Sequence, residues 1–434
     1  MPVPSRLAIA LALACTSSAF AARIGTIPPV EPLTAERVAA LPATERAAWA
    51  AYLARSDAQR AADRAALAAE RQGLATLPPT PAGGHSEGSM PLDKPAAWYA
   101  SDAALLVARN IVSFQTPAGG WGKNQPRDKP PRERGQAFVA DNNSKRATAG
   151  DFDLAQDAQW SYVGTIDNDA TITEIRFLAR VAAQLPGEAG DVYRQSAQRG
   201  LAYLLAAQYP NGGWPQVWPL QGGYHDAITM NDDAFVEVAE MMGMVVRGEA
   251  DLGFMPAALK TAAAAAQAKA LQLLLAMQIR INGKPTLWAQ QHNALTLVPE
   301  SARNYEPPAL SSSESARALV YLMNLPNPSP AVVEAVTGGV AMLRQLAVRD
   351  RAWVKVDEAQ GRRLIEQPGA GPLWSRYYDA VTLKPVFGDR DKSLHDDVNE
   401  ISLERRNGYN WWSSGPAKAL AGYGAWAAKW MTTP

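Results

Sequence analysis

The sequence predicts a mainly helical fold, an (α/α) toroid of helical hairpins with small β hairpins and long loops on one rim, plus an N-terminal helical arm. Apolar residues recur three and four positions apart, as helices require, in six runs: 104–114, 171–183, 193–208, 234–246, 257–278 and 313–323. Three runs end in a glutamine (Gln115, Gln208 and Gln278) that precedes a loop containing glycine and tryptophan. A helix–loop unit that recurs in this way is typical of repeated helical hairpins. Strand patterns occur only in loops, near 381–387 and 400–403.

Residues 1–21 have the features of an export signal. Arg6 supplies the positive charge, residues 7–14 form the apolar centre, and an Ala-x-Ala cleavage site ends at Ala21. The apolar stretch is too short for a membrane-spanning helix. Cleavage after Ala21 predicts a secreted or periplasmic protein without disulfides, since the single cysteine, Cys15, lies inside the signal. A lipid anchor on Cys15 is the less favoured alternative.

The remaining chain divides at a linker. Residues 22–95 form the expected helical arm, rich in Ala, Arg and Glu, and end in a segment rich in Pro, Gly and Ser. A structural arm without chemistry is the preferred interpretation of this region. Residues 96–434 contain the helical runs and form the expected toroid domain. No interface signal stands out, so we expect a monomer.

Charge excludes several classes of partner. The 42 Lys and Arg residues balance the 42 Asp and Glu residues, so no global field favours nucleic acid or a membrane surface. A charged ligand has to be bound by local clusters.

Two acidic clusters begin helical runs. Asp167, Asn168 and Asp169 precede one run, and Asn231, Asp232 and Asp233 precede another. Such residues are favoured helix caps, so capping explains any one of them by itself. Two clusters that each follow a tryptophan loop favour function, because together they offer the hard oxygen ligands that calcium prefers. The four histidines and single cysteine do not form a zinc motif, and no G-x-S-x-G sequence supports a serine hydrolase.

Arginines in aromatic loops form a second group of candidates. Arg303, Arg376, Arg390 and the Arg405-Arg406 pair lie in loops that also contain Trp, Tyr or Phe. A guanidinium can bind a carboxylate through two parallel hydrogen bonds. Surface solvation or pairing with nearby aspartates is the alternative for each arginine.

Eight motifs between Trp98 and Trp426 together resemble, in order, the family 10 polysaccharide lyases, which are pectate lyases. They are 119–124 (GGWGKN), 165–171 (TIDNDAT), 209–216 (YPNGGWPQ), 228–234 (ITMNDDA), 288–292 (WAQQH), 302–306 (ARNYE), 387–391 (FGDRD) and 401–409 (ISLERRNGY). The resemblance does not include the N-terminal arm. It implies an (α/α) toroid, Ca²⁺ as cofactor and β-elimination of polygalacturonate, giving 4,5-unsaturated oligogalacturonides.

The resemblance also implies roles for single residues. Arg303 matches the arginine that acts as Brønsted base. Arg376 and Arg390 match arginines that hold substrate carboxylates, and Lys123 is a further candidate in the groove. Asp167, Asn168 and Asp232 match the cluster where calcium meets the uronate carboxylate, so Asp167 and Asp232 are the expected metal ligands and Asn168 contacts substrate.

This chemistry demands a base able to remove the C5 proton of a uronate. Calcium and arginine can neutralise the neighbouring carboxylate and stabilise the enolate-like charge. Free guanidinium has a pKa above about 12, so a neutral arginine requires burial, nearby positive charge or alkaline solution. We therefore predict an alkaline activity optimum.

Two other functions fit part of the pattern. An inverting glycosidase could use two carboxylates chosen from Asp167, Asp232, Asp233 and Glu306, and its products would carry no double bond. A non-catalytic polyuronate-binding protein could use the same groove, but it would need no base at Arg303.

Overall fold

The computed structural model describes residues 23–84, 89–140, 148–154, 157 and 160–431. The expected signal peptide and Cys15 lie outside these residues. Helices make up about 47% of the described residues and strands about 11%. No helix in the described ranges has the length and apolarity needed to cross a membrane.

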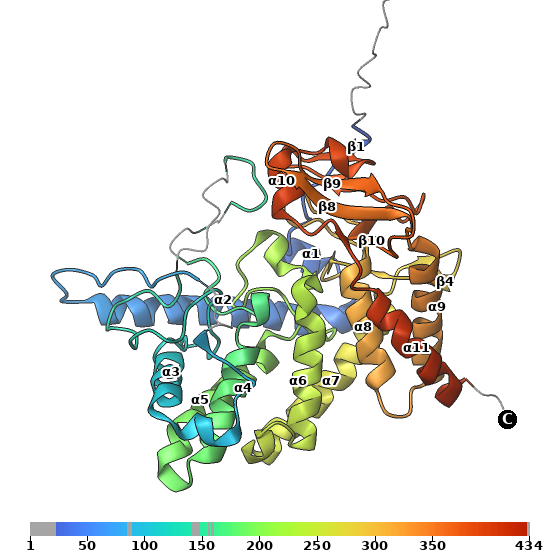
Figure 1. The fold of residues 1–434 in the computed structure, drawn as a ribbon. Helices are drawn as coiled ribbons and strands as arrows, with labels where there is room; N and C mark the ends of the chain where they lie inside the picture. The colour runs from blue at the N-terminus through green and yellow to red at the C-terminus, as the bar shows by residue number, and fades with distance from the viewer. Residues whose placement is uncertain (1–22, 85–88, 141–147, 155–156, 158–159, 432–434) are drawn as a thin grey trace, which may run out of the picture.

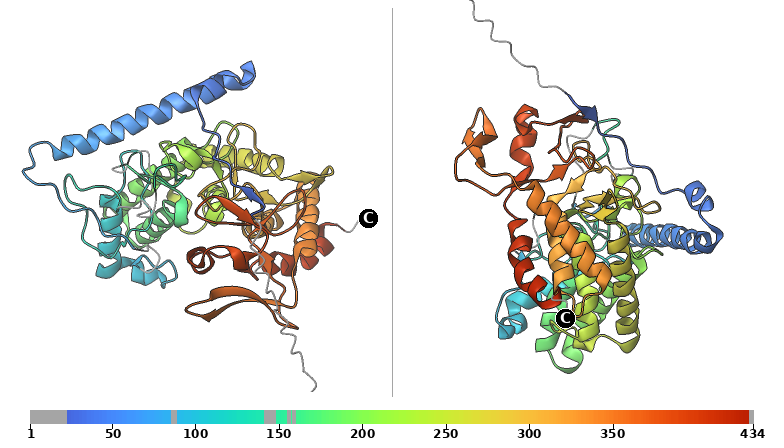
Figure 2. Two further views of the ribbon diagram at one scale, coloured as in Figure 1. Left: turned by 90° about the horizontal axis from the view of Figure 1, so that it is seen from above. Right: turned by 90° about the vertical axis from the view of Figure 1, so that its right-hand side faces the viewer.

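The N-terminal region lies along the body of the molecule. After β1 (Gly25–Thr26) and α1 (Ala35–Ala39), the long helix α2 (Ala43–Arg71) crosses behind the other helices (Figure 1, Figure 2). The buried rings of Trp49 and Tyr52 pack on Tyr209, and the Tyr52 hydroxyl donates to the carbonyl of Ala207 at 2.8 Å. Helix α2 therefore shares its core with the main body and is packed against it.

The main body contains two rows of helices. The elements are η2 (Ala96–Ala100), α3 (Asp102–Ser113), α4 (Ile172–Gln184), η4 (Gly187–Gly190), α5 (Asp191–Ala207), α6 (Ala234–Arg247), η7 (Leu252–Phe254), α7 (Ala257–Ala276), α8 (Ser312–Asn324), α9 (Pro330–Leu346) and α11 (Ala417–Trp430). Helices α3, α5, α7 and α9 pack in sequence as one row, and α4, α6, α8 and α11 as the other. Helices α4 and α5, α6 and α7, and α8 and α9 pack as antiparallel pairs between the rows.

The repeated glutamines connect neighbouring helices of one row. The side-chain amide of Gln208, after α5, donates to Gly212 in its own loop and to Ala266 in α7, at 3.0 and 2.9 Å. Gln115 and Gln278 make the equivalent pairs of bonds. Each glutamine side chain donates to one loop carbonyl and one helix carbonyl, which would otherwise be buried without a hydrogen-bond partner.

The repeated tryptophans anchor the loops. Four fully buried indoles each donate a hydrogen bond of 2.7–2.8 Å to a carbonyl in the preceding helix of the α3, α5, α7 and α9 row: Trp121 to Ile111, Trp214 to Leu204, Trp288 to Leu274 and Trp374 to Leu343. A buried indole contributes a large apolar surface but needs a partner for its N–H. The Gly/Trp loops therefore have a structural role.

The expected toroid is wrong. Within the described part of the chain, helix packing joins neighbours along each row but does not join α3 and α4 at one end to α9 and α11 at the other. Figure 1 shows α3 and α11 at opposite sides, so the helices form an open arc. The physical reason is the segment after α9. Where a ring would need another helical pair, residues 351–413 form strands and short helices.

Short strands form six small sheets among the described residues. Their order is β1–β13–β12, β10–β14, β11–β7–β5, β2–β6, β3–β4 and β8–β9, and the pairs are antiparallel. The bounds are β2 (Ile228–Thr229), β3 (Arg280–Ile281), β4 (Lys284–Pro285), β5 (Trp288–Ala289), β6 (Gln291–His292), β7 (Leu310–Ser311), β8 (Arg351–Asp357), β9 (Gly361–Glu366), β10 (Trp374–Ser375), β11 (Tyr377–Tyr378), β12 (Phe387–Gly388), β13 (Ser393–His395) and β14 (Trp412–Ser413). A second aromatic core includes Tyr377, Phe387 and Trp411, which belong to the segment between α9 and α11.

Candidate active site

The starts of three neighbouring helices meet at one end of the arc. Helix α4 follows the turn η3 (Asp167–Asp169), α6 follows η6 (Asn231–Asp233), and α8 begins at Ser312 with Glu314 in its first turn. Helix N-termini carry unpaired N–H groups and partial positive charge, which favour negatively charged groups. The packing of these helices therefore brings the two predicted acidic clusters together and adds a third polar helix start.

Both acidic turns have unusual backbone. Asn168, Asp169, Asp232 and Asp233 all have positive φ, between 50° and 63°. This left-handed conformation costs most residues about 1 kcal/mol or more, and Asn and Asp tolerate it best. The Asn and Asp residues at these positions therefore fit the left-handed backbone of both turns.

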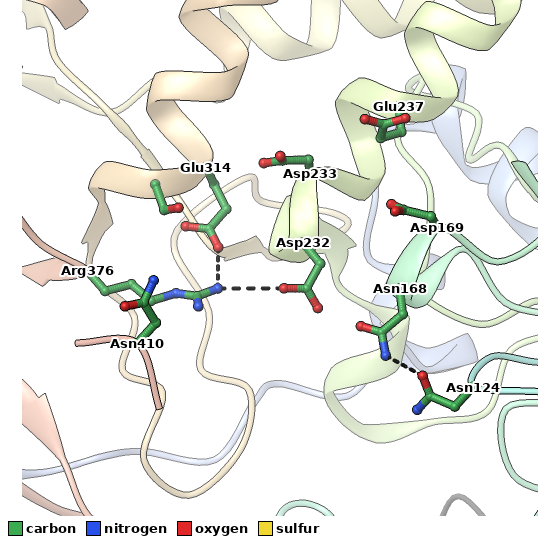
Figure 3. A pocket seen from close by; sticks show the side chains of 10 residues that line it. Asn124, Asn168, Asp169, Asp232, Asp233, Glu237, Glu314, Arg376 and Asn410 are labelled. Atoms are coloured by element: carbon green, nitrogen blue, oxygen red, sulfur yellow. Dashed lines mark hydrogen bonds and ion pairs between the residues drawn. The ribbon is translucent and has the colours of Figure 1, made fainter. Parts of the chain in front are cut away.

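The site is a groove with two connected chambers. The first has a volume of about 480 Å³, and its lining includes Asn124, Asn168, Asp232, Glu314 and Arg376 (Figure 3). The second has a volume of about 250 Å³ and is lined by residues that include Lys123, Asp153, Asp167, Arg303 and Glu306. Both chambers share Asn124, Asn168 and Asp232.

Arg376 points into the first chamber between carboxylates. It follows β10, and its Nη2 donates to Oε1 of the buried Glu314 and to Oδ1 of Asn231, the latter at 3.1 Å. The same nitrogen lies 4.0 Å from Oδ1 of Asp232 (Figure 3). Burial disfavours its charge, yet Glu314 more than compensates and raises the pKa of Arg376 well above the ordinary value. Arg376 is therefore a fixed cation at the groove.

Arg303 is held by a buried glutamate. Its backbone N–H, Nε and Nη2 donate to the carboxylate of Glu306 at 3.0, 2.9 and 2.6 Å. Burial opposes the charge on both groups, but the ion pair raises the pKa of Arg303 well above its usual value and lowers the pKa of Glu306 to about 2. In this state Arg303 is a cation, and Glu306 does not fit the acid of a glycosidase.

Lys123 also lines the second chamber. Its ammonium donates to Oδ2 of Asp167 and lies 3.7 Å from the centre of the Tyr162 ring. Burial would lower the pKa of Lys123, but Asp167 raises it above the ordinary value. The structure thus brings Lys123, Asp167, Asn168, Asp232, Arg303 and Arg376 together around one groove.

Arg390 is the exception among the predicted residues. It lines neither chamber, and its Nε and Nη2 each lie 3.2 Å from the carboxylate of Glu404. Its guanidinium lies 5.2 Å from the centre of the Tyr305 ring, which Arg303 and Arg405 also approach at 5.0 and 4.3 Å. Arg390 is thus beside the groove in this structure.

A buried polar network joins the two chambers. The hydroxyl of Tyr409 donates to Oε1 of Glu306 at 2.7 Å and lies 2.6 Å from the hydroxyl of Tyr377. Gln290 accepts from Tyr377 and donates to Asn231, which in turn accepts from Arg376. Arg303 and Arg376 are therefore joined by a continuous series of polar contacts.

The sequence interpretation did not include four residues of the second chamber and its wall. Asp153 and Tyr162 come from the long segment between the first two motifs, while Tyr224 and His225 follow the loop of Trp214. The Tyr224 hydroxyl donates to Oδ1 of Asp153 at 2.7 Å, and the Tyr162 hydroxyl lies 2.9 Å from Nε2 of His225. Nothing in the spacing of these four residues along the chain indicates that they form one cluster.

Glu314 was also missed as a groove residue. Glu314 follows the Ser311–Ser313 turn, where Ser-x-x-Glu reads as a capping box, and Ser311 does donate to it. Its second oxygen holds Arg376 instead of a backbone group. Only the fold shows this additional role.

Among the described residues, no group of three or more His, Cys, Asp or Glu side chains is arranged to hold a metal ion. The donor set still fits a hard cation in part. Asp167 and Asp232 line the same chamber, and burial together with the charge of Asp167 raises the pKa of Asp232 to about 6. A divalent cation between them would relieve this repulsion, but it would need further oxygen ligands.

Comparisons with known proteins match this chain to polysaccharide lyases. The family model described as pectic acid lyase matches residues 115–420. A solved family 10 polysaccharide lyase from Cellvibrio cellulosa is 28% identical over 80% of this chain and 98% of its own, with a TM-score of 0.63. A variant of that lyase with one aspartate replaced by alanine, in complex with trigalacturonic acid, has the same identity and TM-score over 79% and 98%. None of the curated proteins matches significantly. The chain therefore belongs to the pectic acid lyase family.

Proposed function

We propose that this protein, a pectate lyase, cleaves α-1,4-linked polygalacturonate by calcium-assisted β-elimination in the two-chamber groove. The observation that carries the proposal is the placement of three cations, Lys123, Arg303 and Arg376, around the acidic pair Asp167 and Asp232. A polyanion needs fixed positive charge for binding, and its uronate carboxylate needs further charge neutralisation as the C5 proton leaves. The trigalacturonic acid bound by the similar Cellvibrio lyase is such a ligand.

Calcium fits this groove as a shared ion. We assign Asp167 and Asp232 as its protein ligands, with Asn168 beside them as a contact for substrate. Because these residues alone supply too few oxygens for calcium, carboxylates of the substrate would complete the coordination. When bound, calcium supplies positive charge that acidifies the C5 proton and stabilises the enolate-like anion.

Arg303 is the proposed Brønsted base. Glu306 occupies its Nε and Nη2, and among the described residues no hydrogen bond is made by Nη1. The ion pair therefore fixes the guanidinium and leaves one terminal nitrogen for the C5 proton. The same ion pair opposes loss of the proton from Arg303, so the reaction should require alkaline solution.

Arg376 is the proposed partner for a substrate carboxylate in the first chamber. Lys123 would serve the second chamber in the same way, since both cations face the groove and remain charged. Arg390 requires a rearrangement of its pair with Glu404 before it could contact substrate.

The test is formation of an unsaturated uronate, followed by ultraviolet absorbance, from polygalacturonate with calcium or with chelator. Arg303→Ala is compared with Arg280→Ala, which removes an exposed arginine that pairs with Glu334 and lines neither chamber. We expect a calcium-dependent rise that Arg303→Ala abolishes and Arg280→Ala retains. New reducing ends without absorbance would support hydrolysis instead, and binding without either product would support a carbohydrate-binding protein.

We also propose that the protein is exported through a cleaved N-terminal signal peptide. Amino-terminal sequencing of protein collected outside the cytoplasm would show a new end at Ala22 if the signal is cleaved as predicted. A monomer is the expected oligomeric state.

A further inference from the structure

The second chamber contains a chain of proton-bearing groups to which the proposed mechanism assigns no role. It runs from the Asp153 carboxyl through the hydroxyls of Tyr224 and Tyr162 to the imidazole of His225, with contacts of 2.7, 3.3 and 2.9 Å. Asp153, Tyr162 and Tyr224 line the same chamber as Arg303. A β-elimination needs a second proton transfer besides removal of the C5 proton, because the departing sugar oxygen must be protonated.

The direction of this chain follows from His225. Its Nδ1 lies 3.2 Å from the carbonyl oxygen of Gly222, which can only accept a hydrogen bond. Burial and the nearby Lys123 lower the pKa of His225 to about 4, so the ring is neutral with its proton on Nδ1. Nε2 therefore accepts from the Tyr162 hydroxyl, while the single proton of the Tyr224 hydroxyl is donated to Asp153.

Resting on the proposed function, we propose that Tyr224 is the general acid that protonates the leaving glycosidic oxygen. Its hydroxyl lies between Asp153 and Tyr162, in the chamber that Arg303 also lines. In the step, Arg303 that has first lost a proton to hydroxide takes the C5 proton, the C4–O4 bond breaks as the C4–C5 double bond forms, and O4 takes the proton of Tyr224. Tyr224 then regains a proton from water, and protonated Arg303 returns its proton to water, so charge and atoms balance.

The surroundings suit a tyrosine that gives up its proton briefly. The Tyr162 hydroxyl can turn from His225 to donate to a Tyr224 anion, and the Lys123 ammonium lies 3.7 Å from the centre of the Tyr162 ring. His225 stacks on Tyr224 with 4.0 Å between ring centres. Burial raises the pKa of Tyr224 well above its ordinary value, which keeps the acid protonated in alkaline solution.

The scaffold holds these groups in place. The backbone N–H of Phe152 donates to Asn304, next to Arg303, at 2.9 Å, and Lys392 donates to the carbonyl of Gly150. The N–H of Tyr162 donates to Gln221 at 2.7 Å. Both walls of the chamber are thus fixed to each other by hydrogen bonds between segments far apart in sequence.

The experiment compares two leaving groups on wild type and Tyr224→Phe. One substrate is polygalacturonate; the other is trigalacturonate with fluoride replacing the C4 hydroxyl of its non-reducing end, since fluoride leaves without a proton. We expect Tyr224→Phe to lower kcat on polygalacturonate about 100- to 10,000-fold, as loss of a general acid does, with KM little changed. Fluoride release should stay within about threefold of wild type.

Equal losses with both substrates would overturn the proposal, because Tyr224 would then have a structural role. An unchanged rate on polygalacturonate would also overturn it. If wild type eliminates neither substrate, the proposed lyase function fails instead.

Tyr193→Phe is the matched control, a buried tyrosine of α5 away from the groove. Should Tyr224→Phe not fold, Asp153→Asn, which changes the acceptor of the Tyr224 proton, must show the same rescue by fluoride.

Discussion

Nη2 of Arg303 lies 2.6 Å from Oε1 of Glu306, and the same carboxylate also binds the Nε and backbone N–H of Arg303. Glu306 is buried and its pKa is lowered to about 2, so it is ionised in neutral and alkaline solution. A permanent anion at this position makes Arg303 a weaker acid than free arginine. This pair therefore decides whether Arg303 acts as a base or as a fixed cation.

Glu306→Gln should separate these two roles. If Arg303 is the base, removing the anion lowers the pKa of Arg303, and the alkaline rise of kcat/KM should move down by at least about one pH unit. The measurement is the pH profile of wild type and variant between neutral and strongly alkaline solution. A lower rate with an unchanged profile would indicate that Arg303 acts as a cation, and Glu404→Gln serves as a comparison at a pair outside both chambers.

Calcium binding should depend on pH through Asp232. Its pKa is raised to about 6 by burial and by Asp167, so protons compete with calcium as the pH falls through 6. Calorimetric titrations should show weaker calcium binding at pH 5 than at pH 8, and trigalacturonate should strengthen it. Tight, pH-independent binding without substrate would contradict the shared-ion site.

The same raised pKa has a consequence for stability. Folded protein binds the Asp232 proton more tightly than the unfolded chain, so the calcium-free protein gains stability from this group at low pH. That contribution is lost as the pH rises from the unfolded value of about 4 through the folded value of about 6. Thermal unfolding at pH 4 and pH 7 with chelator should show a smaller difference for Asp232→Asn than for wild type. An identical difference in both proteins would contradict the assignment.

Glu314→Gln should weaken substrate binding. The carboxylate holds Arg376 toward the first chamber, and its amide substitute keeps the size but not the charge. We expect KM for polygalacturonate to rise about threefold to tenfold, with a smaller change in kcat, because a hydrogen bond to a charged group contributes roughly 1.5–3 kcal/mol and is only partly lost. Glu334→Gln, in a surface pair with Arg280, is the control and should leave KM unchanged.

Gln208→Ala should destabilise the fold without altering the groove chemistry. The substitution leaves the carbonyls of Gly212 and Ala266 without their side-chain donor. Two such losses should lower the free energy of unfolding by about 1–3 kcal/mol, measured with chemical denaturant. The exposed Gln195 of α5 provides the matched control, and its replacement should cost less than about 0.5 kcal/mol.

The sequence by itself determined most of the helices in the two rows. Apolar spacing located α3 to α8 but not α9 or α11, and the motifs from Gly119 to Tyr409 carried the family resemblance that the comparisons confirmed. The repeated Gln and Trp residues recur in the sequence because each makes the same local hydrogen bond in successive loops. Such local, repeated constraints leave a pattern that can be read along the chain.

Only the tertiary structure determined which helices and side chains lie beside one another. Whether the helical rows close into a ring depends on accumulated packing angles and on the strands after α9, which helical periodicity does not encode. The pairing of Arg303 with Glu306 spans only three residues, yet its burial depends on Tyr409 and the C-terminal core. The contact between Tyr224 and Asp153 joins segments about 70 residues apart. Their hydroxyl and carboxyl groups meet only because the helix starts converge on one groove.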